Sequence, residues 1–165
     1  MTSREAERTV RLSIVDRLID RDPKAAADPP RSWEQSVAEL KAALLRDLTW
    51  LLNTRRVIEP APAQYAEVQA SLYHYGLPDV TSLSGDSTAV RRRLARQVEE
   101  IIRLFEPRLT GVKVTLANPK GDNERRIRFV IEGMLRMDPD PERVVFDTVL
   151  EPASGTFEVS GEADA

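Results

Sequence analysis

The residues best placed to do chemistry are two opposite charges separated by a proline, Glu106-Pro107-Arg108. The proline fixes the backbone between them, so the two side chains point in defined directions. A glutamate at the C-terminal end of a helix is unfavourable for the helix dipole, and Arg108 or another basic group would offset it. The residues alone leave two interpretations open: an ordinary helix stop with an internal ion pair, or a rigid charged knob that contacts a partner protein.

A third interpretation makes Glu106 the general acid of a glycosidase, so that the chain would be a lysozyme-like peptidoglycan hydrolase. Such enzymes normally need a second carboxylate at a set distance across a sugar-binding cleft. They also usually hold sugars with aromatic side chains, and this chain has nine aromatic residues in all. Because no acidic pair stands out near Glu106, we expect the protein not to be an enzyme, and the hydrolase is kept as the alternative function.

Composition removes much of the remaining catalytic chemistry and the Cys/His metal sites. The sequence has no cysteine and a single histidine, His74, so neither a disulfide framework nor a Cys/His zinc site can be built. His74 has no nucleophile-elbow pattern nearby, and we predict a structural or surface role for it. No glycine-rich phosphate loop is present. We therefore predict no catalytic residues, no cofactor, no metal site and no small-molecule substrate.

The charge balance gives no general reason to bind nucleic acid or an anionic membrane. The chain has 165 residues and a net charge of -3. Five arginines gather in one predicted helix, but glutamates accompany them and no aromatic residues are interleaved as stacking platforms; the five are Arg91, Arg92, Arg93, Arg96 and Arg103. A solvated helix face is the favoured interpretation. Without a long apolar run or an apolar secretion core, the chain is predicted to be cytoplasmic and not inserted in a membrane.

Two long amphipathic helices must position the Glu-Pro-Arg corner. The first begins at Ser32, where Ser32 and Gln35 have the spacing of a capping box, and runs to about Asn53. The second begins near Ser87 or Thr88 and stops before Pro107. Apolar residues recur every three or four positions in both, at Val37, Leu40, Leu44, Leu48 and Leu51, and at Val90, Leu94, Val98, Ile101 and Phe105. A short third helix is predicted from Tyr65 to Tyr73, with Val68 and Leu72 facing inward and Gly76 closing it.

After Pro107 the apolar period changes from about 3.6 to 2, which indicates strands. Four are predicted, around 112–116, 127–137, 144–150 and 156–160, joined by turns such as 118–123. Short connections between neighbours imply an antiparallel meander. The predicted fold class is therefore α+β, with two main amphipathic helices and a short one packed on a four-stranded, mostly antiparallel sheet.

The first 31 residues are charged and proline-bearing, and we predict a flexible tail with one short docking helix. Its apolar island includes Leu12, Val15, Leu18 and Ile19. The island either packs on its own domain or orders on a partner, and docking is slightly favoured because the tail has little else to bury against. The predicted division is thus a tail over 1–31, a domain over 32–160 and an acidic tail over 161–165.

Three segments together resemble one known family. The corner Phe105-Glu106-Pro107-Arg108-Leu109, with a helix before it and a meander after it, resembles the phage baseplate wedge family once labelled lysozyme-like. The segments Leu51-Leu52-Asn53-Thr54-Arg55 and Tyr75-Gly76-Leu77-Pro78-Asp79 are similar to its type VI secretion branch, the TssE-type proteins. The resemblance covers residues from about 10 to 160.

This resemblance implies a structural role in the baseplate of a contractile injection machine, on the cytoplasmic side of the inner membrane. It assigns Glu106 and Arg108 to partner contacts with the core helical bundle of the wedge, and Pro107 to setting their geometry. The implied partners are other wedge subunits, of the TssF, TssG and TssK types, and sheath subunits. It also implies that the sheet helps to initiate sheath assembly, for which pairing at a strand edge is physically reasonable.

Overall fold

The computed structural model describes residues 13–19, 24, 32–81, 87–117, 126–138 and 140–161. The expectations for Leu12, for the turn at 118–123 and for most of the acidic tail lie outside these residues. The chain forms two compact units, residues 1–44 and 45–165, with the boundary inside one helix. Each unit is described by itself, and the predicted domain division stays a prediction. No helix among the described residues is long and apolar enough to span a membrane.

The first unit holds a short helix, α1 (Ile14–Leu18), and the beginning of α2 (Trp33–Asn53). Ser13 caps α1, because its hydroxyl oxygen accepts the Asp16 backbone N–H at 3.1 Å. The capping box at α2 is confirmed: the Gln35 side chain accepts the Ser32 N–H at 3.0 Å, and the Ser32 hydroxyl accepts the Gln35 N–H at 3.2 Å.

The second unit contains the remainder of α2, α3 (Ala66–Gln69), a 3₁₀ turn η1 (Leu72–His74) and α4 (Thr88–Phe105). The helix ends predicted at Asn53 and before Pro107 are confirmed. The apolar stripe of α4 is buried at Leu94, Val98, Ile101 and Ile102. On α2, Leu48, Leu51 and Leu52 are buried. Regular apolar spacing therefore predicted most of the buried face of both helices, although Val37, Val90 and Phe105 are only half-buried.

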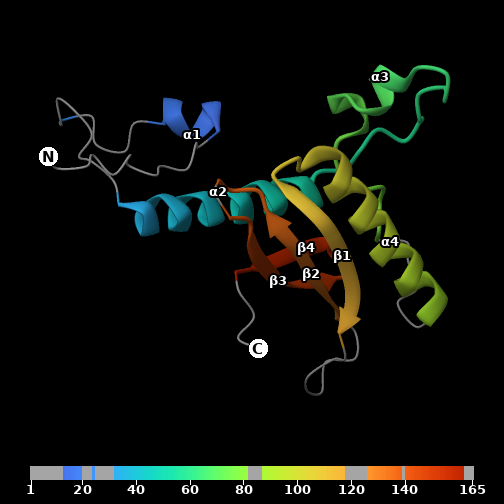
Figure 1. The fold of residues 1–165 in the computed structure, drawn as a ribbon. Helices are drawn as coiled ribbons and strands as arrows, with labels where there is room; N and C mark the ends of the chain where they lie inside the picture. Colours follow the sequence, from blue (N-terminus) through green and yellow to red (C-terminus); the bar gives the residue numbers. More distant parts are fainter. Residues whose placement is uncertain are drawn as a thin grey trace, which may run out of the picture. The chain divides into compact units, whose positions relative to one another are not determined.

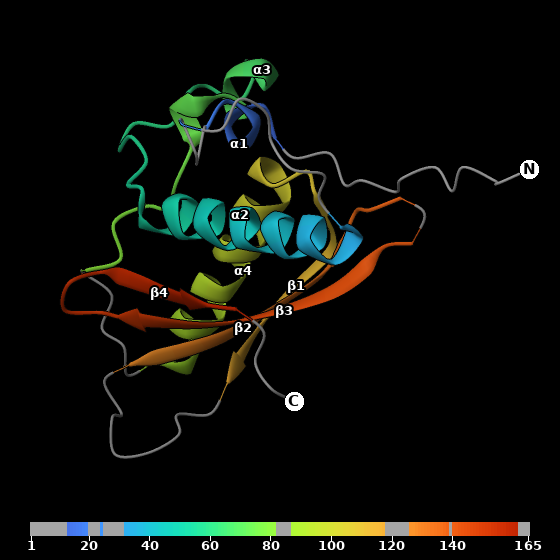
Figure 2. The same cartoon turned by 90° about the vertical axis from the view of Figure 1, so that its left-hand side faces the viewer.

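Four strands follow the corner: β1 (Leu109–Ala117), β2 (Ile127–Leu135), β3 (Glu142–Glu151) and β4 (Thr156–Ser160). They form one antiparallel sheet in the order β1-β2-β3-β4. Side chains alternate between the two faces, so Phe129, Phe146 and Phe157 are buried on one of them. Figures 1 and 2 show α4 and residues 45–53 of α2 on the same side of the sheet. The α+β fold class is confirmed.

β1 contains a β-bulge close to the corner. Its register with β2 shifts between Thr110 and Lys113, and Gly111 adopts a φ of 61°, which L-residues with a Cβ rarely adopt. The extra residue restores the alternation, so that Leu109 and Val112 are both buried although three positions separate them. The strand therefore joins the core directly after Arg108.

The predicted helix over 65–73 is wrong in its length and in one buried residue. The helix α3 stops at Gln69, and the Ser71 hydroxyl then accepts the Tyr73 N–H, which starts the separate turn η1. Leu72 was expected to face inward but is 82% exposed, because this break changes the helical phase. Both views show the segment with α3 and η1 extending away from the sheet (Figures 1 and 2).

Candidate functional site

The corner is built where α4 ends and β1 begins. Phe105 is the last residue of α4, and the Glu106 N–H still donates to the Ile102 carbonyl at 2.8 Å. The Leu109 N–H then donates back to the Glu106 carbonyl at 3.1 Å, which closes a tight turn around Pro107. Pro107 itself is exposed. The backbone of the corner is thus hydrogen-bonded on both sides of an exposed proline.

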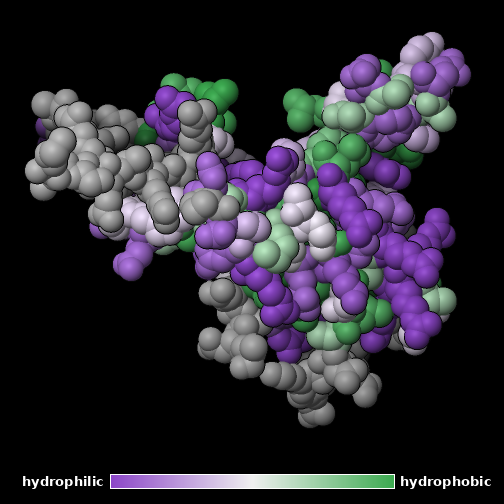
Figure 3. Space-filling model, in the orientation of Figure 1, coloured by the Kyte–Doolittle hydropathy of each residue, from purple (hydrophilic) through white to green (hydrophobic). Residues whose placement is uncertain are grey.

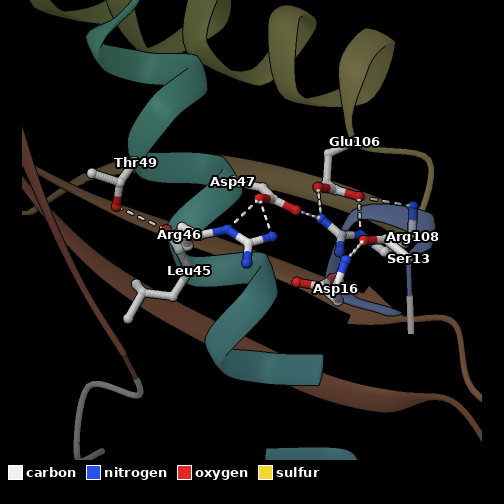
Figure 4. A network of polar contacts seen from close by, with 8 residues as sticks. All are labelled: Ser13, Asp16, Leu45, Arg46, Asp47, Thr49, Glu106 and Arg108. Atoms are coloured by element: carbon white, nitrogen blue, oxygen red, sulfur yellow. Dashed lines mark hydrogen bonds and ion pairs between the residues drawn. The ribbon is translucent and has the colours of Figure 1, made fainter. Parts of the chain in front are cut away.

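Arg108 lies between two carboxylates (Figure 4). Its Nε donates to Glu106 Oε1 at 2.7 Å, and its Nη2 donates to Glu106 Oε2 at 2.5 Å. The same Nη2 donates to Asp47 Oδ2 at 2.6 Å, from α2. The Arg108 backbone N–H adds a bond to Glu106 Oε1 at 3.2 Å. This bidentate arrangement uses the planar fork of arginine, which lysine cannot reproduce.

The question left open by the sequence is settled for the isolated chain: Glu106 pairs with Arg108. The Glu106 side chain is only 6% exposed, against 22% for Arg108 and 25% for Asp47. The hydrogen bond to Glu106, reinforced by both carboxylate charges, raises the pKa of the Arg108 guanidinium above its ordinary value although burial lowers it. A partner that meets this corner therefore meets Pro107 and Arg108, with Glu106 behind them.

Asp47 was missed by the sequence reasoning. It lies 61 positions before Arg108, and nothing in local spacing connects the two. The available signal was its place on α2 beside the apolar stripe, next to the buried Leu48. Asp47 also accepts two bonds from Arg46 at 2.9 and 2.8 Å, and the Arg46 guanidinium lies 5.0 Å from the centre of the half-exposed Trp50 ring.

The three sequence segments singled out for their resemblance meet in space. The Tyr75 ring packs edge-on against Phe105 with centroids 5.3 Å apart. Burial, followed by the charges of Asp47 and Glu106, raises the pKa of the Tyr75 hydroxyl. Close by, the Leu77 N–H donates to the Thr54 carbonyl at 2.9 Å, and the Arg56 N–H donates to the Leu77 carbonyl at 3.0 Å. The segments at 51–55 and 75–79 therefore support the corner from the α2 side.

Gly76 is required for this junction. Its φ is 97°, and a Cβ there would lie 2.3 Å from the Thr54 carbonyl oxygen. Any other residue would clash with backbone that cannot move aside. Gly76 thus allows the chain to return close to the end of α2.

His74 has the structural role that was predicted. It is buried, and its Nε2 accepts the Ala61 backbone N–H at 3.2 Å. Its ring centre is 5.4 Å from that of Tyr73, whose hydroxyl donates to the Glu59 carbonyl. These contacts hold the loop between α2 and α4 in shape.

The predicted N-terminal docking residues belong to the first unit and are described separately from the corner. Val15, Leu18 and Ile19 are exposed, as is Ile14, while Leu12 lies outside the described residues. A helix of five residues cannot bury all of these side chains against itself. The structure therefore leaves their docking role as a prediction.

The arginines of α4 form an outward face. Arg92, Arg93 and Arg96 are exposed, and hydrophilic side chains cover this side of α4 in Figure 3. Arg103 instead reaches β1, where its Nη2 donates to the Val112 carbonyl at 2.8 Å. The distribution agrees with a solvated helix face.

The Glu106 carboxylate is not accessible at this site, and the described residues hold no metal centre. Within the described ranges no group of three or more His, Asp or Glu residues could hold a metal ion. Both Glu106 oxygens accept bonds from Arg108, and the side chain is nearly enclosed. A general acid must reach the leaving group of its substrate, so this arrangement does not fit the glycosidase interpretation.

Comparison with known proteins adds one match. Residues 38–140 match the family model described as baseplate wedge protein gp25. The match spans more than half of the chain and includes Asp47, the whole of α4, the corner and the first two strands. No curated protein matches the chain.

Proposed function

The chain belongs to the baseplate wedge protein gp25 family, and from this premise we propose that it is a TssE-type wedge subunit of a type VI secretion baseplate. Membership of this family supports a structural role in a phage tail-like baseplate. The narrower assignment to type VI secretion is supported by the segments 51–55 and 75–79, which pack beside the corner.

The observation that supports this proposal most strongly is that Arg108 is hydrogen-bonded to two carboxylates. Arg108 is held from two sides by Glu106 and Asp47, so α2, α4 and β1 are locked together at one corner. A rigid corner loses little conformational entropy on binding, which favours affinity. We infer that this corner docks onto the helical core bundle of the wedge, formed by subunits of the TssF, TssG and TssK types.

Two features of the corner are exposed to such a partner. Pro107 is exposed, and Leu104, on the last turn of α4, is 48% exposed. Arg108 Nη1 is enclosed and has no hydrogen-bond acceptor within the described part of the chain. A buried donor without an acceptor is costly, so this nitrogen makes the free corner less stable than a fully hydrogen-bonded one would be.

The exposed apolar residues of α1 support a second contact in the proposed assembly. Ile14 and Leu18 are 74% and 78% exposed in a helix too short to be stable alone. We infer that the island at Leu12, Val15, Leu18 and Ile19 orders on a neighbouring wedge subunit. The baseplate would lie on the cytoplasmic side of the inner membrane, with the sheet directed toward the first sheath subunits.

The decisive experiment compares two Arg→Lys variants in co-purification with the other wedge subunits. Arg108→Lys keeps the charge between Glu106 and Asp47 but loses the fork, so we expect a folded chain that no longer retains its wedge partners. Arg143→Lys is the matched control, because Arg143 is 65% exposed in a single cross-strand pair with Glu132. Unchanged wedge assembly by folded Arg108→Lys would remove the docking role from the corner.

The alternative function, a peptidoglycan hydrolase using Glu106, has a direct test. A turbidity assay on purified cell wall should show no lysis by the wild-type chain, since the carboxylate is enclosed by Arg108. Lysis by the wild type that disappears in Glu106→Gln would establish the hydrolase instead.

A further inference from the structure

Residues 57–73, which we call the arm, lie in the α2–α4 connection that extends away from the sheet (Figures 1 and 2). Polar side chains fix its backbone. The Gln69 Nε2 donates to the Ala61 carbonyl at 2.7 Å. The Tyr73 hydroxyl donates to the Glu59 carbonyl at 3.0 Å. Because side chains of its second half hold the backbone of its first half, the arm is a defined surface in the free chain and would lose little conformational entropy on binding.

The arm exposes apolar side chains instead of burying them. Ile58 is 96% exposed, and Leu72, at 82%, is nearly as open. Seven large hydrophobic residues are exposed in the described part of the second unit, and all but Trp50 and Leu104 belong to the arm: Val57, Ile58, Tyr65, Leu72 and Tyr73. Figure 3 shows hydrophobic side chains at the surface of this segment. Exposed apolar surface gathered in one place marks a site that another molecule covers.

The charge of the arm indicates what kind of molecule covers it. Its charged residues are Glu59 and Glu67; both are exposed, and the arm contains no Lys or Arg. Among the described residues neither has an ion-pair partner, whereas Glu132 and Glu151 on the sheet are each paired with an arginine. An anionic membrane surface or the arm of a second copy would bring like charges together, whereas Lys or Arg side chains would be attracted.

We propose that the arm is a docking site for an amphipathic, basic segment of another protein. The apolar side chains of that segment cover Ile58 and Leu72, and its Lys or Arg side chains lie beside Glu59 and Glu67. Recognition is by side chains, because backbone groups of the arm are already used to hold it in shape. The inference is independent of the docking assigned to the corner, since the exposure and charge of the arm alone define the partner.

A designed amphipathic peptide of leucine and lysine, titrated into the full chain and followed by amide NMR, tests this. We expect the amide signals of the arm to shift, and binding to weaken as salt is added. Leu72→Asp should raise the dissociation constant about tenfold or more, because apolar contact area is lost. Ala63→Asp adds the same charge at an exposed position of the arm and should bind like the wild type. Slow exchange of the Ala61 N–H, which donates to His74, shows that each variant keeps the arm in shape.

Unchanged binding by Leu72→Asp would overturn the proposal, as would a wild-type chain whose arm signals do not shift. The choice of a basic partner has its own test. Glu67→Lys should weaken binding, whereas Glu158→Lys, the same charge change at an exposed position of β4, should not. Equal binding of a leucine–glutamate peptide would contradict the choice.

Two other occupants of the arm are distinguished by Leu72→Asp. Wild-type binding to phosphatidylglycerol vesicles that this variant loses would identify a membrane surface. Wild-type dimers in sedimentation that the variant abolishes would identify a second copy of the chain. Either result would overturn the assignment to another protein.

Discussion

Two charge clusters of this molecule use the same residue types with different consequences. At the corner, one guanidinium joins two carboxylates, and the Glu106 side chain is 6% exposed. On the outer face of the sheet, Arg126–Glu151 and Arg143–Glu132 are single cross-strand pairs in which every side chain is at least 38% exposed. Exposed pairs are screened by water and contribute little, whereas an enclosed carboxylate depends on its partner. The convergence of two carboxylates on one guanidinium and the nearly enclosed Glu106, not the number of charges, therefore distinguish the corner from these two exposed pairs.

The largest expected effect follows from removing the shared cation. In Arg108→Ala the enclosed Glu106 loses its ion pair, and we expect the free energy of unfolding to fall by about 3–5 kcal/mol. Urea denaturation of both proteins measures this difference. A loss below about 1 kcal/mol would place the corner in the same class as the exposed pairs.

A smaller effect is expected from Tyr75 at alkaline pH. Burial and the neighbouring carboxylates raise its pKa from 10.0, so the unfolded chain ionises first as the pH rises. The stability due to this shift is complete below about pH 10 and is lost as the pH rises through the folded-state pKa. Tyr75→Phe should consequently lose less stability than the wild type above about pH 10 in urea titrations. Tyr65→Phe controls for the loss of a tyrosine hydroxyl, and equal slopes in wild type and Tyr75→Phe would refute the electrostatic link.

The smallest effect is expected on the sheet face. Arg143→Ala breaks a pair 3.1 Å long between side chains that are 65% and 38% exposed, so stability should change by about 0.5 kcal/mol or less. The same urea experiment tests this. A loss comparable with that of Arg108→Ala would erase the distinction between the two clusters.

The sequence predicted the elements better than it predicted the site. The two long helices, the end before Pro107 and the capping box at Ser32 were predicted from apolar spacing, from the proline and from the Ser32–Gln35 spacing, because these features are set by local physics. The pairing of Glu106 with Arg108 stayed open, because sequence does not give side-chain direction. Asp47 was missed since its contact spans 61 positions, and Leu72 was misplaced because one Ser71 hydrogen bond changes the helical phase.

The central claim, that the corner docks the chain into the wedge, is tested most directly by site-specific crosslinking in the assembled baseplate. A photo-reactive residue at position 104, exposed beside the corner, should crosslink to the subunits of the helical core bundle. The same residue at position 93, exposed near the other end of α4, is the control. We predict bundle crosslinks from position 104 and not from position 93. Bundle crosslinks from position 93 with none from position 104 would contradict the account.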